Sequence, residues 1–271
     1  MRLKKTLSAL RSPSYAFYKL CKSYVRTYEG YSYRFSKNGE ARLLEVLGAH
    51  EMKTVFDVGA NVGDWSVLAA AQFPGADIHA FELSQNTFHA LKPVADQHGI
   101  TANNCGLSDS SGEITYKDYG DGSTVNTIVA SAAFHDGRLA ATEKQAQVLR
   151  GDDYCAQHGI EAIDLLKIDV EGAEHLVLQG FERMFKEKRI AVVQFEYGFV
   201  NADAHFLMKD FFTLFQSWGY VVGPLKPKGA IFGEFDYVLN TFKSGPNYVA
   251  ISSDRQDLIQ AVAGPSIKGF Y

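Results

Sequence analysis

The stretch Val-Phe-Asp-Val-Gly-Ala-Asn-Val-Gly-Asp at residues 55–64 joins a short apolar run to a turn that contains two glycines. The apolar run, followed by helical character from Trp65 to Ala71, predicts a strand, a tight turn and a helix. Gly59 and Gly63 lack the Cβ atoms that would keep a ligand from the backbone, and free amides at the helix start point into the turn. The stretch therefore predicts a site for a nucleotide-like ligand.

The charge of this turn indicates what kind of ligand it takes. A dinucleotide site needs the spacing G-x-G-x-x-G, whereas this turn reads G-x-N-x-G with Asp57 two residues before its first glycine. A carboxylate at this point suits a cation such as S-adenosylmethionine, which carries a sulfonium and an ammonium. We expect Asp57 and the turn residues Gly59, Ala60, Asn61 and Gly63 to bind it.

A second motif, Leu-Lys-Ile-Asp-Val-Glu-Gly-Ala-Glu at 166–174, also ends an apolar strand in carboxylates and a glycine. Ligands of open parallel sheets bind at the carboxyl ends of strands near the switch point. Both turns are therefore expected to face one crevice.

Strand and helix patterns alternate along the chain, which predicts βαβ units in a mostly parallel sheet. The predicted strands are 54–58, 77–81, 101–106, 163–168 and 190–196, and the predicted helices are 64–72, 85–98, 172–187 and 205–217. Residues 220–223 and 248–252 are expected to pair in antiparallel fashion. Between 108 and 152 the rhythm breaks into turns around β-like runs at 113–117 and 124–129, and this insertion is a candidate lid.

Together, DVGANVGDWS at 57–66 and LLKIDVEGAEHLVLQGF at 165–181 resemble the FkbM family of S-adenosylmethionine-dependent methyltransferases. The resemblance covers roughly 38–252, although Leu-Arg-Gly-Asp-Asp at 149–153 departs from the usual Thr-Leu-Asp-Asp-Leu-like stretch. It implies a class I methyltransferase fold, an α/β Rossmann-like sheet of seven strands flanked by helices. It also implies O-methyl transfer, commonly to sugar or polyketide hydroxyls.

Two further strand ends contribute predicted cofactor contacts. Glu82 follows the second strand, where a carboxylate can accept both ribose hydroxyls; the alternative is a cap on the helix that begins near Ser84. Asn104 and Gly106 lie where the third strand ends, and this turn is expected to pass along the adenine edge.

Three side chains are candidates for catalysis, since an alcohol acceptor must lose its proton to a group within hydrogen-bond reach. Asp169 is expected beside the transferred methyl group, with helix N-capping as its alternative role. Glu196 and His175 are the other candidates, although a lone histidine on a helix is more often structural. Asp169 and Glu196 together could bind Mg²⁺ or Ca²⁺, but the pattern assigns no metal ligand. Glu174 is expected to hold the motif together by hydrogen bonds.

Length and charge suggest one catalytic domain with an extension. The 271 residues, 46% of them hydrophobic, can bury one substantial core. We expect a basic amphipathic helical extension at 1–37, divided at Pro13, a methyltransferase domain at 38–252 and a tail at 253–271. Residues 1–38 carry a net charge of +8 and the rest −12. The extension is expected to pack on the domain, form a homodimer contact or touch an anionic membrane.

The cysteine content and the charge of the body predict where the protein is located and which partners it binds. Three cysteines without close spacing and the lack of a membrane-spanning stretch favour a cytoplasmic protein, peripheral at a membrane if the extension binds lipid. The acidic body and the absence of an Asn/Asp-Pro-Pro-Tyr-like motif speak against nucleic acid as a partner.

Three functions therefore compete. The first is S-adenosylmethionine-dependent methyl transfer to a hydroxyl of a sugar, glycan, glycolipid or secondary metabolite. The second is a NAD-dependent oxidoreductase, which the glycine spacing does not fit. The third is a non-catalytic S-adenosylmethionine-binding scaffold.

Overall fold

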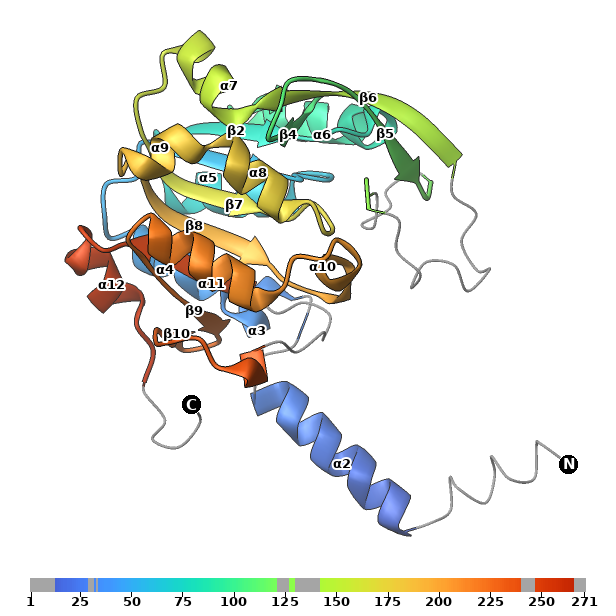
Figure 1. Ribbon diagram of the computed structural model, residues 1–271, viewed down its shortest axis with the longest axis vertical. Coiled ribbons are helices and arrows are strands. Elements are labelled where there is room, and N and C mark those ends of the chain that lie inside the picture. Colours follow the sequence, from blue (N-terminus) through green and yellow to red (C-terminus); the bar gives the residue numbers. More distant parts are fainter. Residues whose placement is uncertain are drawn as a thin grey trace, which may run out of the picture.

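A single mixed sheet forms the centre of the protein (Figure 1). The computed structural model describes residues 13–28, 32, 34–120, 127–129, 142–239 and 247–265. Within them the sheet has eight strands in the order β10-β9-β11-β8-β7-β1-β2-β3. The strands are β1 (Thr54–Val58), β2 (Asp77–Phe81), β3 (Thr101–Asn103), β7 (Ile163–Ile168), β8 (Ile190–Glu196), β9 (Tyr220–Lys226), β10 (Gly229–Ala230) and β11 (Asn247–Ser252).

The direction of the strands matches the expected class of fold. The strands β3, β2, β1, β7 and β8 run parallel, and β11 is antiparallel to both β8 and β9. The two-residue β10 is an addition at the edge beside β9, so the remaining seven strands form the predicted sheet. The predicted pairing of 220–223 with 248–252 is confirmed.

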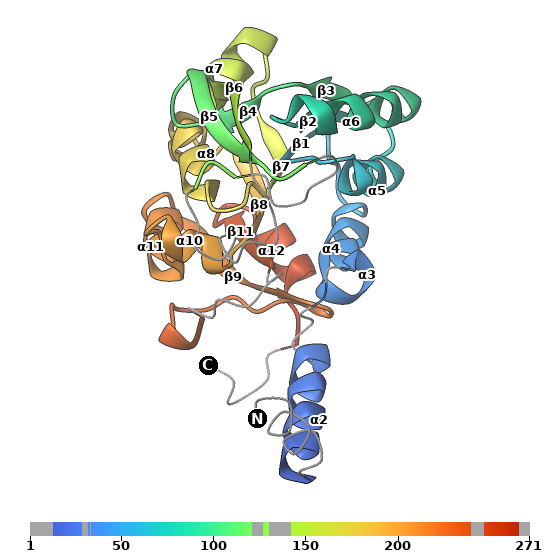
Figure 2. The ribbon, with the colours of Figure 1, turned by 90° about the vertical axis from the view of Figure 1, so that its right-hand side faces the viewer.

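Helices cover both faces of the sheet (Figures 1 and 2). One apolar cluster draws side chains from α7 (Gly151–His158), α8 (Glu174–Gly180), α9 (Glu182–Lys186) and α11 (Met208–Ser217). The other draws them from α4 (Glu40–Leu47), α5 (Asp64–Gln72), α6 (Gln85–His98) and α12 (Gln256–Val262). Two short helices, α3 (Phe35–Asn38) and α10 (Phe199–Asp203), lie near the carboxyl ends of the strands, and η2 (Tyr237–Leu239) is a 3-10 turn.

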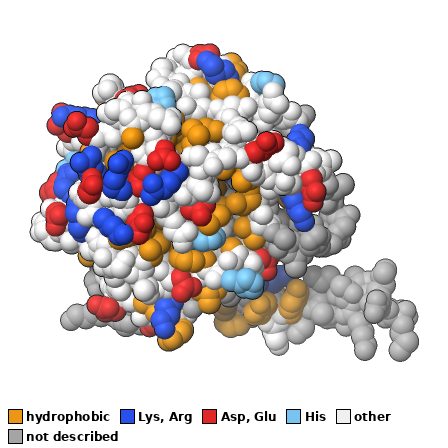
Figure 3. All heavy atoms as spheres, turned by 45° about the horizontal axis from the view of Figure 1, so that its top comes forward, with side chains coloured by type: hydrophobic (Ala, Val, Ile, Leu, Met, Phe, Trp, Pro, Cys, Tyr) orange, Lys and Arg blue, Asp and Glu red, His pale blue; other side chains and the backbone are white. Residues whose placement is uncertain are grey.

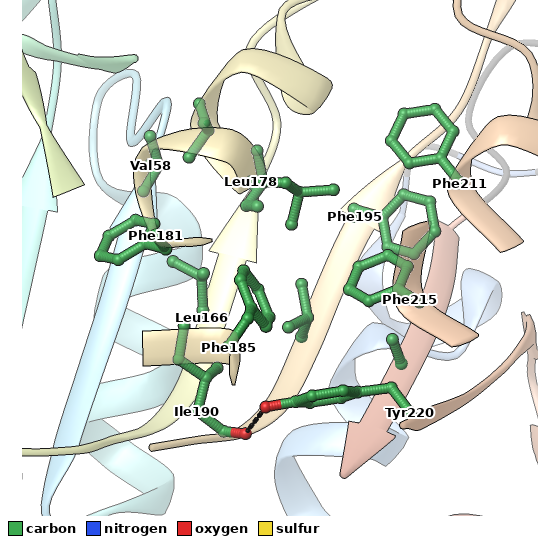
Figure 4. Packing of buried hydrophobic residues seen from close by; sticks show 14 of the residues in the cluster. Val58, Leu166, Leu178, Phe181, Phe185, Ile190, Phe195, Phe211, Phe215 and Tyr220 are labelled. Atoms are coloured by element: carbon green, nitrogen blue, oxygen red, sulfur yellow. Dashed lines mark hydrogen bonds between the residues drawn. The ribbon is translucent and has the colours of Figure 1, made fainter. Parts of the chain in front are cut away.

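Aromatic side chains fill the first cluster (Figure 4). The rings of Phe185 and Trp218 stack at 4.4 Å between centroids. The buried hydroxyl of Tyr220 donates to the Ile190 carbonyl at 2.6 Å, which satisfies its polar atom within the apolar layer. This packing fixes β7 and β8, whose ends carry the second motif.

The inserted segment forms a small second sheet, β4-β6-β5. It contains β4 (Gly106–Ser108), β5 (Gly112–Asp118) and β6 (Thr142–Arg150). The predicted strand 101–106 is therefore wrong at its end, because the chain leaves the main sheet after Asn103 and Gly106 pairs with Val148 instead. The predicted run 113–117 lies in β5; of 124–129 the structure describes 127–129, where Thr127 bridges to Lys117.

Two other boundaries differ from the sequence prediction. The helix expected at 172–187 begins at Glu174 and is interrupted at Phe181, whose fully buried ring packs in the core. The domain also extends past the expected boundary at 252, because Leu258 and Val262 of α12 are buried in the second cluster.

The amino-terminal extension is helical from Pro13, where α2 (Pro13–Tyr28) begins. Proline is favoured in the first turn because its missing N–H has no helical partner there. The part of the extension before Pro13 lies outside the described residues. Among the described helices, none has the length and apolar character needed to cross a bilayer.

Candidate functional site

A crevice of about 400 Å³ opens at the carboxyl ends of β1, β2, β7 and β8. It brings the two predicted motifs together, as the parallel sheet requires. Its lining comes from both motif turns and from the segment after β8: Phe35, Gly59, Ala60, Asn61, Val62, Asp64, Trp65, Glu82, Leu83, Lys167, Asp169, Val170, Glu171, Gly172, Glu174, Glu196, Gly198, Phe199, Val200 and Asn201.

Gly59 sets how closely the two turns approach. Its φ is +82°, and a Cβ atom there would lie 1.9 Å from the carbonyl oxygen of Asp169. No other residue fits such a position without moving backbone. Gly63, at φ +95°, instead faces Leu91 of α6, 2.8 Å from where its Cβ would be, and it does not line the crevice.

Glu82 closes the first turn from the side of β2. One carboxylate oxygen accepts from the amide of Asn61 at 3.0 Å and the other from the amide of Ser84 at 2.8 Å. Burial raises the pKa of Glu82 to about 7 despite these two bonds. Ser84 is the N-cap of α6 and accepts from Thr87. Glu82 also accepts from the amide of this N-cap residue, but it is buried rather than at the surface, and it lines the crevice.

Asp57 lies beneath the crevice rather than in it, which corrects the expectation that it contacts the ligand. Its carboxylate is fully buried. One oxygen accepts from the Ser66 hydroxyl at 2.6 Å, and the other lies 3.0 Å from the Lys167 ammonium. Asp57 therefore acts on the site through Lys167.

Lys167 is the cation at the centre of this acidic site. Its ammonium lies 3.0 Å from Asp57, 3.4 Å from Asp169 and 3.2 Å from the Gly59 carbonyl oxygen. Burial acts to lower the pKa of Lys167, but Asp57, Asp169 and Glu40 together raise it above its ordinary value. The lysine is therefore charged, and it links the ends of β1 and β7.

Asp169 and Glu196 form a carboxyl pair at the ends of β7 and β8. Their side chains are hydrogen bonded to each other, which requires one proton between them. Burial, and then the charge of Asp169, raise the pKa of Glu196 well above its usual range. A carboxyl group whose pKa is raised in this way holds its proton near neutral pH, so Glu196 donates the hydrogen bond and Asp169 accepts it.

Glu174 holds the loop that follows Asp169, as the sequence analysis predicted. It accepts from the amides of Val170 and Gly172 and from the Asn201 side chain. The helix α8 begins at Glu174 after Ala173, so the alternative role of Asp169 as its N-cap is wrong.

The loop itself is held in an unusual conformation. Glu171 has a φ of +53°, which is uncommon for a residue with a side chain. Burial, followed by the charges of Asp169 and Glu174, raises the pKa of Glu171 well above its ordinary value. Thr127 donates from the inserted segment to the Glu171 carbonyl at 2.6 Å, so this insertion reaches the rim of the crevice.

Besides Asp57 and Gly63, the structure places three further predicted site residues outside the crevice lining. His175 stacks on Phe206 at 4.8 Å between centroids, and burial lowers its pKa. Asn104 donates its side-chain amide to the Glu82 carbonyl, and Gly106 packs under Val148. His175 therefore takes a packing role. Asn104 and Gly106 support the ends of β2 and β3 without lining the crevice.

Sequence reasoning missed Lys167, although a signal was present: a charged residue inside the apolar strand 163–168. Buried lysines without partners are rare, so this position indicated a buried carboxylate nearby.

A second buried network joins the amino-terminal Asn-Gly-Glu stretch to the sheet. Glu40 accepts from Gln194 at 2.6 Å and from Asn247 at 3.1 Å, and Asn38 donates to the same carboxylate. Burial raises the pKa of Glu40, while Lys167 opposes that shift. The network fixes α3 and α4 beside β8 and β11, and thereby places Phe35 at the crevice.

The carboxylates do not form a recognisable metal centre. Across the described ranges, no three His, Cys, Asp or Glu side chains are grouped so that they could hold a metal ion. Asp169 and Glu196 are hydrogen bonded to each other, and the Lys167 ammonium lies 3.4 Å from Asp169.

A glycine turn and a carboxylate pair at the ends of a parallel sheet, with one reversed strand between β8 and β9, define the class I methyltransferase architecture. The family profile of the methyltransferase FkbM domain matches residues 57–222. This is more than half of the chain, which therefore belongs to the FkbM family of methyltransferases, as the two motifs predicted.

Two curated relatives and one solved structure show what the chain is similar to. The 31-O-demethyl-FK506 methyltransferase FkbM of Streptomyces tacrolimicus is 34% identical over 153 residues, which are 47% of this chain and 59% of that protein. The hexuronic acid methyltransferase AglP of Haloferax volcanii is 25% identical over 178 residues, 64% of this chain and 69% of that protein. Among solved structures, the O-methyltransferase TomG of Streptomyces achromogenes, in complex with SAM, aligns with a TM-score of 0.42 and 10% identity over 78% of each chain.

Proposed function

We propose that the protein is an S-adenosylmethionine-dependent O-methyltransferase whose acceptor is a hydroxyl of a sugar, glycan, glycolipid or secondary metabolite. The observation that carries the proposal is the crevice in which the glycine turn, Glu82 and the Asp169–Glu196 pair face one another. The names of two relatives, one acting on 31-O-demethyl-FK506 and one on a hexuronic acid, support polyketide and sugar acceptors.

The lining fits a cationic donor. Its acidic side chains include Asp64, Glu82, Glu171 and Glu174, whereas Lys167 is already neutralised by Asp57 and Asp169. Burial raises the pKa of Glu82, Glu171 and Glu174 above its usual range, and a bound cation would favour the charged forms of these carboxyl groups, so the lining and a positive ligand would stabilise each other. Glu82 offers remaining lone pairs to hydroxyl donors, and the backbone of Gly59, Ala60 and Asn61 lies open to a ligand.

When bound, S-adenosylmethionine supplies a methyl group already activated by its sulfonium, so the protein's task is to orient the acceptor and take its proton. The Asp169 carboxylate is the base: it would accept the hydroxyl proton as the oxygen–carbon bond forms and the methyl–sulfur bond of the donor breaks, which leaves a neutral thioether. The Lys167 ammonium lies 3.4 Å from the Asp169 carboxylate and orients it. Glu196 positions it by donating a hydrogen bond.

Donor binding is tested by calorimetric titration of the full chain with S-adenosylmethionine, with NAD as the control ligand. We expect saturable binding of S-adenosylmethionine alone and a clear loss of affinity in Glu82→Gln. Glu45→Gln is the matched control, because Glu45 is exposed on α4 and pairs with Arg42. Binding of NAD, or no binding of either ligand, would overturn the proposal.

Catalysis separates the proposal from a non-catalytic scaffold. Transfer of a labelled methyl group to pooled sugars, glycolipids and polyketides is expected with the wild type and absent with Asp169→Asn, while both bind the donor. Donor binding with no transfer to any pool would favour the scaffold.

A further inference from the structure

The helix α2 carries most of the exposed large hydrophobic side chains in the part of the chain that the structure describes. Of the nine large hydrophobic residues that are exposed among the described ones, six lie on this helix. Phe17, Leu20 and Tyr24 are each about two thirds exposed, at 67%, 66% and 69%. With the exposed Cys21 they follow the spacing i, i+3, i+4, i+7, which places them on one face.

The opposite face of α2 is basic. Lys19, Lys22 and Arg26 are spaced i, i+3, i+7, about half a turn from the apolar face, and the helix contains no acidic residue. On the face of the body that Figure 3 shows, by contrast, basic and acidic side chains are interspersed. Lys19 and Lys22 lie near Tyr15 and Tyr18, with 5.1 and 5.9 Å between ammonium and ring centroid.

We infer that α2 docks the protein on an anionic lipid bilayer. An amphipathic helix with lysine and arginine on its polar face and aromatic or leucine residues on the other lies in the plane of the membrane interface. Apolar burial and attraction to anionic headgroups then act together, and tyrosine suits the boundary because its ring is apolar and its hydroxyl is polar.

Charge favours a bilayer over a second copy of the helix. Two α2 helices that paired through their apolar faces would leave three basic residues on the outer face of each copy, without an acidic partner on either helix. An anionic surface neutralises the same charges, each basic residue near it adding attraction.

The position of α2 agrees with docking. The helix extends away from the body in both views (Figures 1 and 2), and η2, which exposes Tyr237 and Val238, lies at the same end of the body. Phe35 lines the crevice, and Tyr28 is the last residue of α2. The chain between these two residues can span at most about 25 Å. Docking would therefore hold the crevice near the membrane and, if the proposed function is right, favour an acceptor anchored there.

The test is co-sedimentation of the full chain with vesicles of phosphatidylcholine, with and without phosphatidylglycerol. We expect binding that depends on phosphatidylglycerol and weakens with salt. The triple variant Lys19→Gln/Lys22→Gln/Arg26→Gln should lower the partition coefficient on the order of 100-fold, since each basic residue contributes roughly fivefold. The matched control removes three exposed lysines from the body, Lys53→Gln/Lys92→Gln/Lys186→Gln, and should bind as the wild type does.

A second variant separates the bilayer from a protein partner. Phe17→Ser/Leu20→Ser/Tyr24→Ser should abolish vesicle binding and leave the mass in solution unchanged by light scattering. A dimer that this variant dissociates, with no vesicle binding by the wild type, would overturn the inference in favour of a second copy. Equal loss in both lysine variants would show attraction by net charge alone and would also overturn it. Calorimetry of S-adenosylmethionine reports the proposed function separately, because α2 contributes no residue to the crevice.

Discussion

Replacing Lys167 by methionine should destabilise the fold more than any surface lysine change. The methionine keeps an unbranched apolar side chain but removes the ammonium that lies 3.0 Å from the fully buried Asp57 carboxylate. Asp57 would then keep only the hydrogen bond from Ser66. Breaking a buried ion pair in this way costs about 3–5 kcal/mol, a large part of the roughly 5–15 kcal/mol by which domains are stable.

The double variant Lys167→Met/Asp57→Asn tests the cause. It removes both charges while leaving an acceptor for Ser66, so most of the lost stability should return. Lys53→Met is the control: its side chain is 70% exposed, and its effect should stay within about 0.5 kcal/mol.

Both effects are measured by urea unfolding at pH 7, followed by circular dichroism. A single-variant cost below about 1 kcal/mol, or a double variant as unstable as Lys167→Met, would refute the view that Lys167 is held for the Asp57 charge.

Three further predictions concern the crevice. Gly59→Ala should lower the free energy of unfolding by well over the roughly 1–2 kcal/mol that a left-handed residue costs, because the added Cβ would meet backbone. The control Gly75→Ala, with φ +89° and no atom within 4 Å of the added Cβ, should lower it by the left-handed cost alone. Equal losses for the two variants in urea unfolding would contradict the close approach at Gly59. The pKa of Glu82 is raised from 4.5 to about 7 in the fold, so its contribution to stability is full below pH 4.5 and is lost as the pH rises through about 7. In urea titrations, the free energy of unfolding should therefore fall less between pH 5 and pH 8 in Glu82→Gln than in the wild type. An equal fall in both proteins would contradict the raised pKa of Glu82. Asp169→Asn should lower kcat by about 100-fold or more, as loss of a general base does. Glu196→Gln can still donate to Asp169 and should stay within about threefold. Similar losses in steady-state assays would contradict the assignment of the proton transfer to Asp169 alone.

Much of the fold follows from local pattern. Predicted strands 54–58, 77–81, 163–168 and 190–196 match the structure at both ends, because each is an apolar run bounded by turn residues. Of the second sheet, the sequence indicated β5 through the run 113–117, but not its partner β6. The strand β6 reads Thr-Glu-Lys-Gln-Ala-Gln-Val-Leu-Arg, and a mostly polar strand becomes visible only through its pairing with β5.

For the site, the sequence by itself determined which strand ends carry glycines and carboxylates, since tight turns and charged groups are local chemical requirements. The roles of those carboxylates depended on tertiary structure. Asp57 and Glu82 are each acidic residues near a strand end, yet one is buried under Lys167 and the other lines the crevice. Burial and ion pairing are set by neighbours more than 20 residues away, so the fold alone decided which carboxylates face the crevice and which hold the charge beneath it.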